Sequence, residues 1–179
     1  RALLNEINHD ALLLVDCIAS LACDEFHMDD WGADVVVAAC QKGIMVPPGV
    51  SFVFFNQKAK DLQNSLEMVS SYWDWRPRIN PDYYYKYFGG TAPTHHLYGL
   101  NVALDMILNE SIEVVWKRHE ILASAIWAAI DGWEKGGELK ANIQDRKLRS
   151  NAVTSLQVHT PKGTHLRKWL QENTGLTIG

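Results

Sequence analysis

Cysteine is scarce in this sequence, with three residues in 179 and no CxxC pair: Cys17, Cys23 and Cys40. An odd count without framework spacing favours reduced thiols in a reducing compartment over a set of disulfides. No apolar run approaches the roughly 18 residues that a membrane helix needs, and no signal peptide opens the chain. We therefore expect a cytoplasmic protein. A peroxisomal one stays open, because a C-terminal address would lie beyond this chain.

An excess of basic charge is also lacking, since the net charge is −4 and the isoelectric point is near 6.0. The densest basic run, Arg146, Lys147 and Arg149, is short, and we interpret it as a solvated loop. This argues against a nucleic-acid partner. With 47% hydrophobic and 21% charged residues the composition is that of a globular protein. The first residue, Arg1, and the strand-like end at 177–179 suggest a piece cut from a longer protein.

Two apolar runs, at residues 11–16 and 34–40, predict strands buried on both faces, and residues 51–55 predict a third strand. Continuous rather than alternating apolar runs are typical of parallel sheets. Apolar spacing predicts helices at 1–8, 57–68, 96–108 and from Ser111 to about 135, followed by a polar loop, a strand at 152–158, a helix at 164–173 and the start of a last strand. Residues 70–94 are aromatic and rich in Pro and Gly, without a clear period. The order indicates an α/β protein with a domain change near the long helix, which we place between 1–110 and 111–179.

Two residues at predicted strand ends carry the chemistry that we expect. Asp16 ends the first buried strand, and Lys42 follows the second within two residues of its end. Ligands of open α/β sheets bind at this carboxyl edge. Lys42 stands between apolar stretches, and partial burial would disfavour its charged form and make it a competent nucleophile. The 26 positions between the two residues correspond to one crossover unit, so both can face one ligand. A pyridine cofactor needs both groups, an amine for its aldehyde and an acid for its ring nitrogen.

Other interpretations of these residues remain. Asp16 alone could cap a helix or bind magnesium in a nucleotide-binding module, although the phosphate loop GxxxxGK[ST] is absent. The adjacent pair His95 and His96 lacks a third ligand at suitable spacing, so we expect no metal site. A structural subunit without a cofactor is a further alternative.

The segments 14–21 (LVDCIASL), 28–35 (MDDWGADV) and 41–49 (QKGIMVPPG) resemble class V aminotransferases. The closest type is the alanine–glyoxylate, serine–glyoxylate or serine–pyruvate group of fold-type I enzymes, which depend on pyridoxal 5′-phosphate (PLP). The pattern Gln-Lys-x-x-x-x-Pro-Pro-Gly is highly specific, and the likeness continues through residues 91–94, 97–100 and 103–107. The implied fold is part of a large domain with a mainly parallel sheet, plus the beginning of a small α+β C-terminal domain.

The resemblance also implies roles for individual residues. Lys42 would bind PLP as a Schiff base and shuttle a proton during transamination, and Asp16 would pair with the pyridine nitrogen. Ile18 would pack against the ring, and Gln41 would reach the phosphate. Thr91 would bind the phosphate held by the partner subunit of a homodimer. The implied reaction moves an amino group from a small amino acid, alanine or serine, to a 2-oxo acid, glyoxylate or pyruvate.

The sequence departs from the family pattern at two positions. Phe88 stands where the family carries Tyr, so one hydroxyl contact to the phosphate is lost, and Cys40 stands where relatives mostly carry Ser. We interpret Cys40 as a buried strand-end thiol rather than a nucleophile. Because the phosphate loop and the substrate-binding Arg of the family lie outside this chain, we expect the chain alone to be inactive. A PLP-dependent lyase or desulfurase is the alternative, but no cysteine follows Cys40 to serve a desulfurase.

Overall fold

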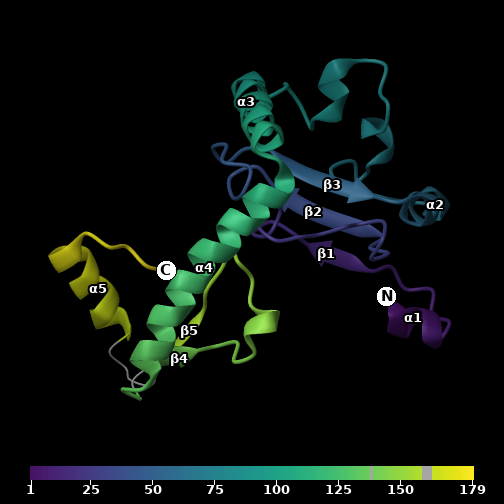
Figure 1. Cartoon of the computed structure of the whole chain (residues 1–179). Coiled ribbons are helices and arrows are strands. Elements are labelled where there is room, and N and C mark those ends of the chain that lie inside the picture. The colour runs from purple at the N-terminus through teal and green to yellow at the C-terminus, as the bar shows by residue number, and fades with distance from the viewer. Residues whose placement is uncertain (138, 159–162) are drawn as a thin grey trace. The chain divides into compact units, whose positions relative to one another are not determined.

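The computed structural model describes residues 1–137, 139–158 and 163–179. The chain divides into two compact units, 1–116 and 117–179, and the long helix α4, Ile112–Glu134, runs through the boundary. The boundary that we drew after residue 110 for the two domains stays a prediction. Figure 1 shows the elements of each unit.

The first unit contains a three-stranded sheet in the order β1-β2-β3, formed by Leu14–Asp16, Val35–Ala39 and Ser51–Phe55. The strands β1 and β2 are parallel, with Asp16 opposite Val37. The strand β3 runs antiparallel to β2, so that Ala39 faces Ser51. The first strand is shorter than its apolar run, which we expected to be a strand from Ala11 onward.

Burial differs sharply between the strands. The central strand β2, VVVAA, is buried at four of its five positions, as its continuous apolar run predicts. The strand β1 is not buried on both faces: Leu14 is 65% exposed, although its apolar run is equally continuous. The apolar run of β1 therefore predicted the strand correctly but its burial incorrectly. The burial of a strand depends on which neighbouring elements cover it.

Asp34 connects the starts of β1 and β2 with the end of β3, at the edge opposite the candidate site. It is 2% exposed, and its carboxylate accepts hydrogen bonds from the Leu13 N–H at 2.7 Å, from Asn56 at 2.8 Å and from the Arg1 guanidinium. Burial raises the pKa of Asp34, but these donors outweigh it and hold the pKa below its usual value. Asn56 also caps the next helix by accepting from the Ala59 N–H at 3.0 Å.

The helices of the first unit follow the predicted spacing, and the first two are shorter than predicted while the third extends two residues further at each end. They are α1, Ala2–Glu6; α2, Gln57–Ser65; and α3, Thr94–Glu110. The aromatic region 70–94 is irregular as expected and contains two short 3-10 helices, Arg76–Arg78 and Tyr84–Tyr87. One side of α3 is buried through Ala103 and Ile107, and these residues contribute to the core beneath the candidate site.

The second unit consists of most of α4, the hairpin-like pair β4 and β5 (Leu139–Ala141 and Leu156–Val158), the 3-10 helix Arg146–Leu148 and α5, Gly163–Thr174. Its core joins Trp127 and Ile130 of α4 to Ala141. Our polar loop after α4 was wrong in part, because it contains β4. The strand predicted from residue 152 begins only at 156, and no strand forms at 177–179.

Candidate active site

Asp16 and Lys42 lie at the same edge of the sheet. Asp16 is the last residue of β1, and Lys42 follows the end of β2 at Ala39 by three positions. Because β1 and β2 are parallel and in register from Leu14 to Asp16, their carboxyl ends point the same way. The predicted meeting of a strand-end carboxylate and a strand-end amine at one edge of the sheet therefore agrees with the topology.

The Asp16 side chain is exposed and partly fixed by the turn that follows it. Its Oδ1 accepts a hydrogen bond from the Ile18 N–H at 2.8 Å, and no group of the described residues donates to its Oδ2. The next residue, Cys17, is 1% exposed and donates its N–H to Val37 O at 2.8 Å, which extends the pairing of β1 with β2. Burial raises the pKa of the Cys17 thiol, and the nearby Asp16 charge adds to this effect, while a hydrogen bond with Ser20 opposes it.

Lys42 and Gln41 are exposed side chains on a turn that we call the lysine loop, residues 41–49. The Met45 N–H donates to Lys42 O at 2.9 Å and closes the turn, with Met45 at φ 63°. The partial burial that we expected for Lys42 is wrong for this chain. Ile44 and Val46 after the lysine and most of β2 before it are buried, while Lys42 itself is exposed.

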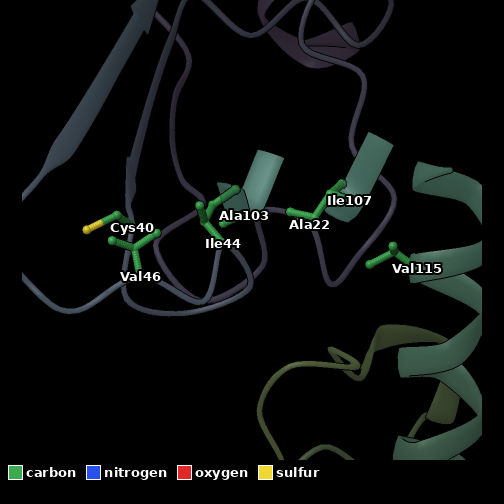
Figure 2. Packing of buried hydrophobic residues seen from close by; sticks show 7 residues of the cluster. All are labelled: Ala22, Cys40, Ile44, Val46, Ala103, Ile107 and Val115. Carbon is green, nitrogen blue, oxygen red and sulfur yellow. The ribbon is translucent and has the colours of Figure 1, made fainter. Parts of the chain in front are cut away.

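Buried residues hold the lysine loop from below. Ile44 and Val46 are 6% and 4% exposed and share a cluster with Ala103 and Ile107 of α3 (Figure 2). Cys40 belongs to the same cluster, is fully buried and donates its thiol to Pro47 O at 3.1 Å. The expectation of a buried strand-end thiol is confirmed.

Gly43 lets the lysine loop touch the turn after Asp16. A Cβ at Gly43 would lie 2.2 Å from Leu21 O and 2.8 Å from Cys23 Sγ, closer than real Cβ atoms come. The backbone of the residue after Lys42 therefore rests directly on the turn that carries Asp16 and Ile18. We did not single out Gly43 from the sequence, although a glycine beside a candidate catalytic lysine is a usable signal for such a close approach.

Thr91 comes from a different part of the chain than the other four predicted residues. It is exposed and precedes α3, which begins at Thr94. Asp16, Ile18, Gln41 and Lys42 gather at the carboxyl edge of β1 and β2, whereas no hydrogen bond in the described part of the chain joins Thr91 to them.

Phe88, in the same segment as Thr91, packs edge-to-face against Tyr84 with ring centroids 5.9 Å apart. Its ring therefore has a packing partner inside the aromatic segment.

The two adjacent histidines do not form a metal site within the residues that the structure describes, where no group of three or more His, Cys, Asp or Glu side chains is suitably placed. Instead, His96 Nε2 lies 2.9 Å from Pro48 O at the end of the lysine loop. Sequence reasoning considered His96 only as a ligand and missed this contact. None of the described helices combines the length and apolarity needed to cross a membrane.

Comparisons with known proteins identify the family of the chain. A family model described as aminotransferase class-V matches residues 3–179. The chain is 33% identical over 185 residues to a serine–glyoxylate aminotransferase of Arabidopsis thaliana, covering 100% of this chain and 44% of the relative. It is 34% identical to an L-aspartate–glyoxylate aminotransferase of Paracoccus denitrificans, covering 91% of this chain and 39% of the relative. The chain thus spans less than half the length of these relatives.

Solved structures show the same fold. Pyridoxamine–pyruvate aminotransferase from Mesorhizobium loti matches with a TM-score of 0.79 and 26% identity over 99% of this chain and 45% of its own. Alanine–glyoxylate aminotransferase from Nostoc sp. matches with a TM-score of 0.82 at 24% identity, over 99% of this chain and 46% of its own. The predicted class, the α/β fold of fold-type I PLP enzymes, is confirmed. From the family model and the extent of these identities, the chain belongs to the class V aminotransferase family.

Proposed function

We propose that the protein of which this chain is part is a PLP-dependent aminotransferase with Lys42 as its cofactor-binding lysine. The observation that carries the proposal is the position of Lys42 and Asp16 at the carboxyl ends of two adjacent parallel strands. In a class V aminotransferase chain, this arrangement supplies the two groups that a pyridine aldehyde cofactor requires.

The chemistry of the exposed groups at this edge fits PLP. The amine of Lys42 is exposed and free to bind an aldehyde. Asp16 keeps Oδ2 open toward a donor such as a protonated ring nitrogen, while Oδ1 is held by Ile18 N–H. An ionised carboxylate hydrogen-bonded to a protonated pyridine keeps that ring positively charged. When bound, PLP would supply the electron sink that makes proton removal at the amino acid Cα possible.

Each predicted residue has a distinct task in this proposal. Lys42 would hold the cofactor through its amine and would move a proton as general base and acid. Asp16 keeps the ring nitrogen protonated, and the half-buried Ile18 offers an apolar surface for the ring face. The amide of Gln41 can donate to the phosphate. Thr91 would donate its hydroxyl to the phosphate held by the partner subunit, which makes the functional unit a homodimer.

The names of the relatives support small amino acids and 2-oxo acids as substrates. The serine–glyoxylate, alanine–glyoxylate and L-aspartate–glyoxylate enzymes share the acceptor glyoxylate and differ in the donor. We therefore propose alanine or serine as the donor and glyoxylate or pyruvate as the acceptor. The odd number of cysteines, all three of them buried, is consistent with the cytoplasm as its compartment. Because this chain covers less than half of its relatives, we expect the chain alone not to transaminate.

Reduction of the full-length protein with borohydride in the presence of PLP tests the proposal. Mass mapping should find the phosphopyridoxyl group on Lys42, and Lys42→Ala should abolish both the label and transamination. Lys58→Ala is the matched control, because Lys58 is an exposed lysine of the same unit whose amine donates one long hydrogen bond, to Ala11 O at 3.5 Å. An unlabelled Lys42 in a protein that binds PLP at another lysine, or does not bind it, would contradict the proposal.

A further inference from the structure

The end of the lysine loop is tied to the first turn of α3 by one side chain. His96 lies on α3, and its Nε2 is 2.9 Å from the carbonyl oxygen of Pro48. Because a carbonyl oxygen only accepts, Nε2 carries the proton and donates it. The contact joins two segments 48 positions apart in the sequence.

A second observation shows that the backbone is shaped around this contact. Gly49, the residue after Pro48, has φ 153°, and a Cβ there would lie 2.4 Å from His96 Nε2. One turn further along α3, a Cβ at Gly99 would lie 3.5 Å from Val46 Cγ1. The missing Cβ of Gly49 therefore allows the loop to approach the imidazole closely, whereas a Cβ at Gly99 would make only an ordinary van der Waals contact.

The end of the loop that receives this hydrogen bond consists of two prolines with a restricted backbone. Pro47 and Pro48 have fixed φ angles and no N–H, so their carbonyl oxygens are the only backbone groups through which they can be held. Pro47 O accepts from the buried Cys40 thiol at 3.1 Å, and Pro48 O accepts from His96. Side chains of two other segments therefore hold the two prolines, Cys40 at Pro47 and His96 at Pro48.

We propose that His96 is a positioning residue that fixes the lysine loop relative to the segment carrying Thr91. Thr91 lies five positions before His96. This inference rests on the proposed function, in which Lys42 holds PLP and Thr91 contacts the phosphate across the dimer. The hydrogen bond of the imidazole is to Pro48 O and not to Lys42 or Thr91. His96 holds the end of the loop that begins at Gln41, and it lies on α3, which begins three positions after Thr91.

Cofactor binding by the full-length protein tests this role. We compare His96→Ala, which removes the donor, with His96→Gln, whose amide nitrogen replaces Nε2. His95→Ala is the matched control, because His95 is the adjacent, exposed histidine on the same turn. The readouts are the dissociation constant of PLP, the fraction of Lys42 labelled after borohydride at a limiting PLP concentration, and the melting temperature without cofactor.

The loss of one hydrogen bond predicts that His96→Ala weakens PLP binding about fivefold and lowers the labelling of Lys42. His96→Gln should restore most of both, and His95→Ala should match the parent protein. Gly49→Ala should reproduce the defect of His96→Ala, because the added methyl group displaces the ring from the loop side.

The outcomes separate this inference from the proposed function. If His96→Ala binds PLP and labels Lys42 like His95→Ala, the positioning role is refuted while Lys42 keeps its role. A defect that His96→Gln does not restore, accompanied by a lower melting temperature without cofactor, also overturns the inference, since it marks His96 as a general structural residue. Absence of label on Lys42 in the parent protein contradicts the proposed function itself.

Discussion

The substitution Gly43→Ala is the sharpest test of how the site is assembled. A methyl group at this position would meet Leu21 O at 2.2 Å and Cys23 Sγ at 2.8 Å. The first distance falls about 0.8 Å short of the 3.0 Å below which real Cβ atoms essentially never come. The obstacle is a backbone carbonyl, so no side-chain rotation can relieve it, and either the lysine loop or the turn after Asp16 must move.

Two effects of this displacement can be measured separately. Overpacking of this kind costs about 1–3 kcal/mol of stability, which urea unfolding of the full-length protein would detect. A shift of Lys42 by roughly 1 Å relative to Asp16 can lower kcat by up to about 100-fold. We expect both effects. The fall in kcat should be larger than the fraction of unfolded protein can account for.

Gly132→Ala is the matched control, because Gly132 lies in α4 and a Cβ there has no atom within 4 Å. Alanine in an open helical position should raise stability by about 0.5–1 kcal/mol and leave kcat unchanged. The reasoning is refuted if Gly43→Ala unfolds at the same urea concentration as the parent protein and transaminates at the same rate.

Four further substitutions or treatments test other parts of the structure. Because the folded pKa of Asp34 is lowered, its ionised carboxylate stabilises the fold above its ordinary pKa of 3.8, and this stabilisation is lost as the pH falls through the folded pKa. The urea midpoint of Asp34→Asn should therefore be lower than that of the parent protein near pH 7, and the two midpoints should converge in acid. Ile130→Ala, at a 1% exposed core position, should cost about 2–5 kcal/mol in the same assay. Met45→Gly, at an exposed residue with φ 63°, should raise the melting temperature by relieving roughly 1 kcal/mol of strain. Because burial raises the pKa of Cys17, native protein at pH 7 should resist iodoacetamide at this thiol while unfolded protein reacts, as peptide mapping would show.

The sequence predicted the positions of Asp16 and Lys42 in the sheet better than it predicted their environment. These positions followed from two apolar runs of strand length and the edge at which parallel strands end. The exposure of Lys42 did not follow, because apolar neighbours were taken to bury it. In the structure Gly43 and Ile44 turn inward and Lys42 turns outward, an alternation set by a tight turn that composition does not reveal.

Long-range contacts were the part that the sequence could not predict. The hydrogen bond from His96 to Pro48 joins residues 48 positions apart, and the Asp34 contact with Arg1 spans 33 positions. Neither follows from local periodicity, which reports only which face of an element is apolar. The short strand β4 was missed for a related reason, since three residues, LKA, are too few to establish a period.

Two carboxylates at opposite edges of the sheet, Asp34 and Asp16, differ in burial and in the number of hydrogen-bond donors that they receive. Asp34, at the edge where the strands begin, is 2% exposed and has donors from Leu13, Asn56 and Arg1 for both oxygens. A carboxylate with this set of partners stabilises the fold. Asp16, at the opposite edge, is exposed and receives one backbone N–H on one oxygen. Under the proposed function, the other oxygen of Asp16 and the exposed amine of Lys42, which follows the end of β2 by three positions, are the two groups that would bind a ligand at the carboxyl edge.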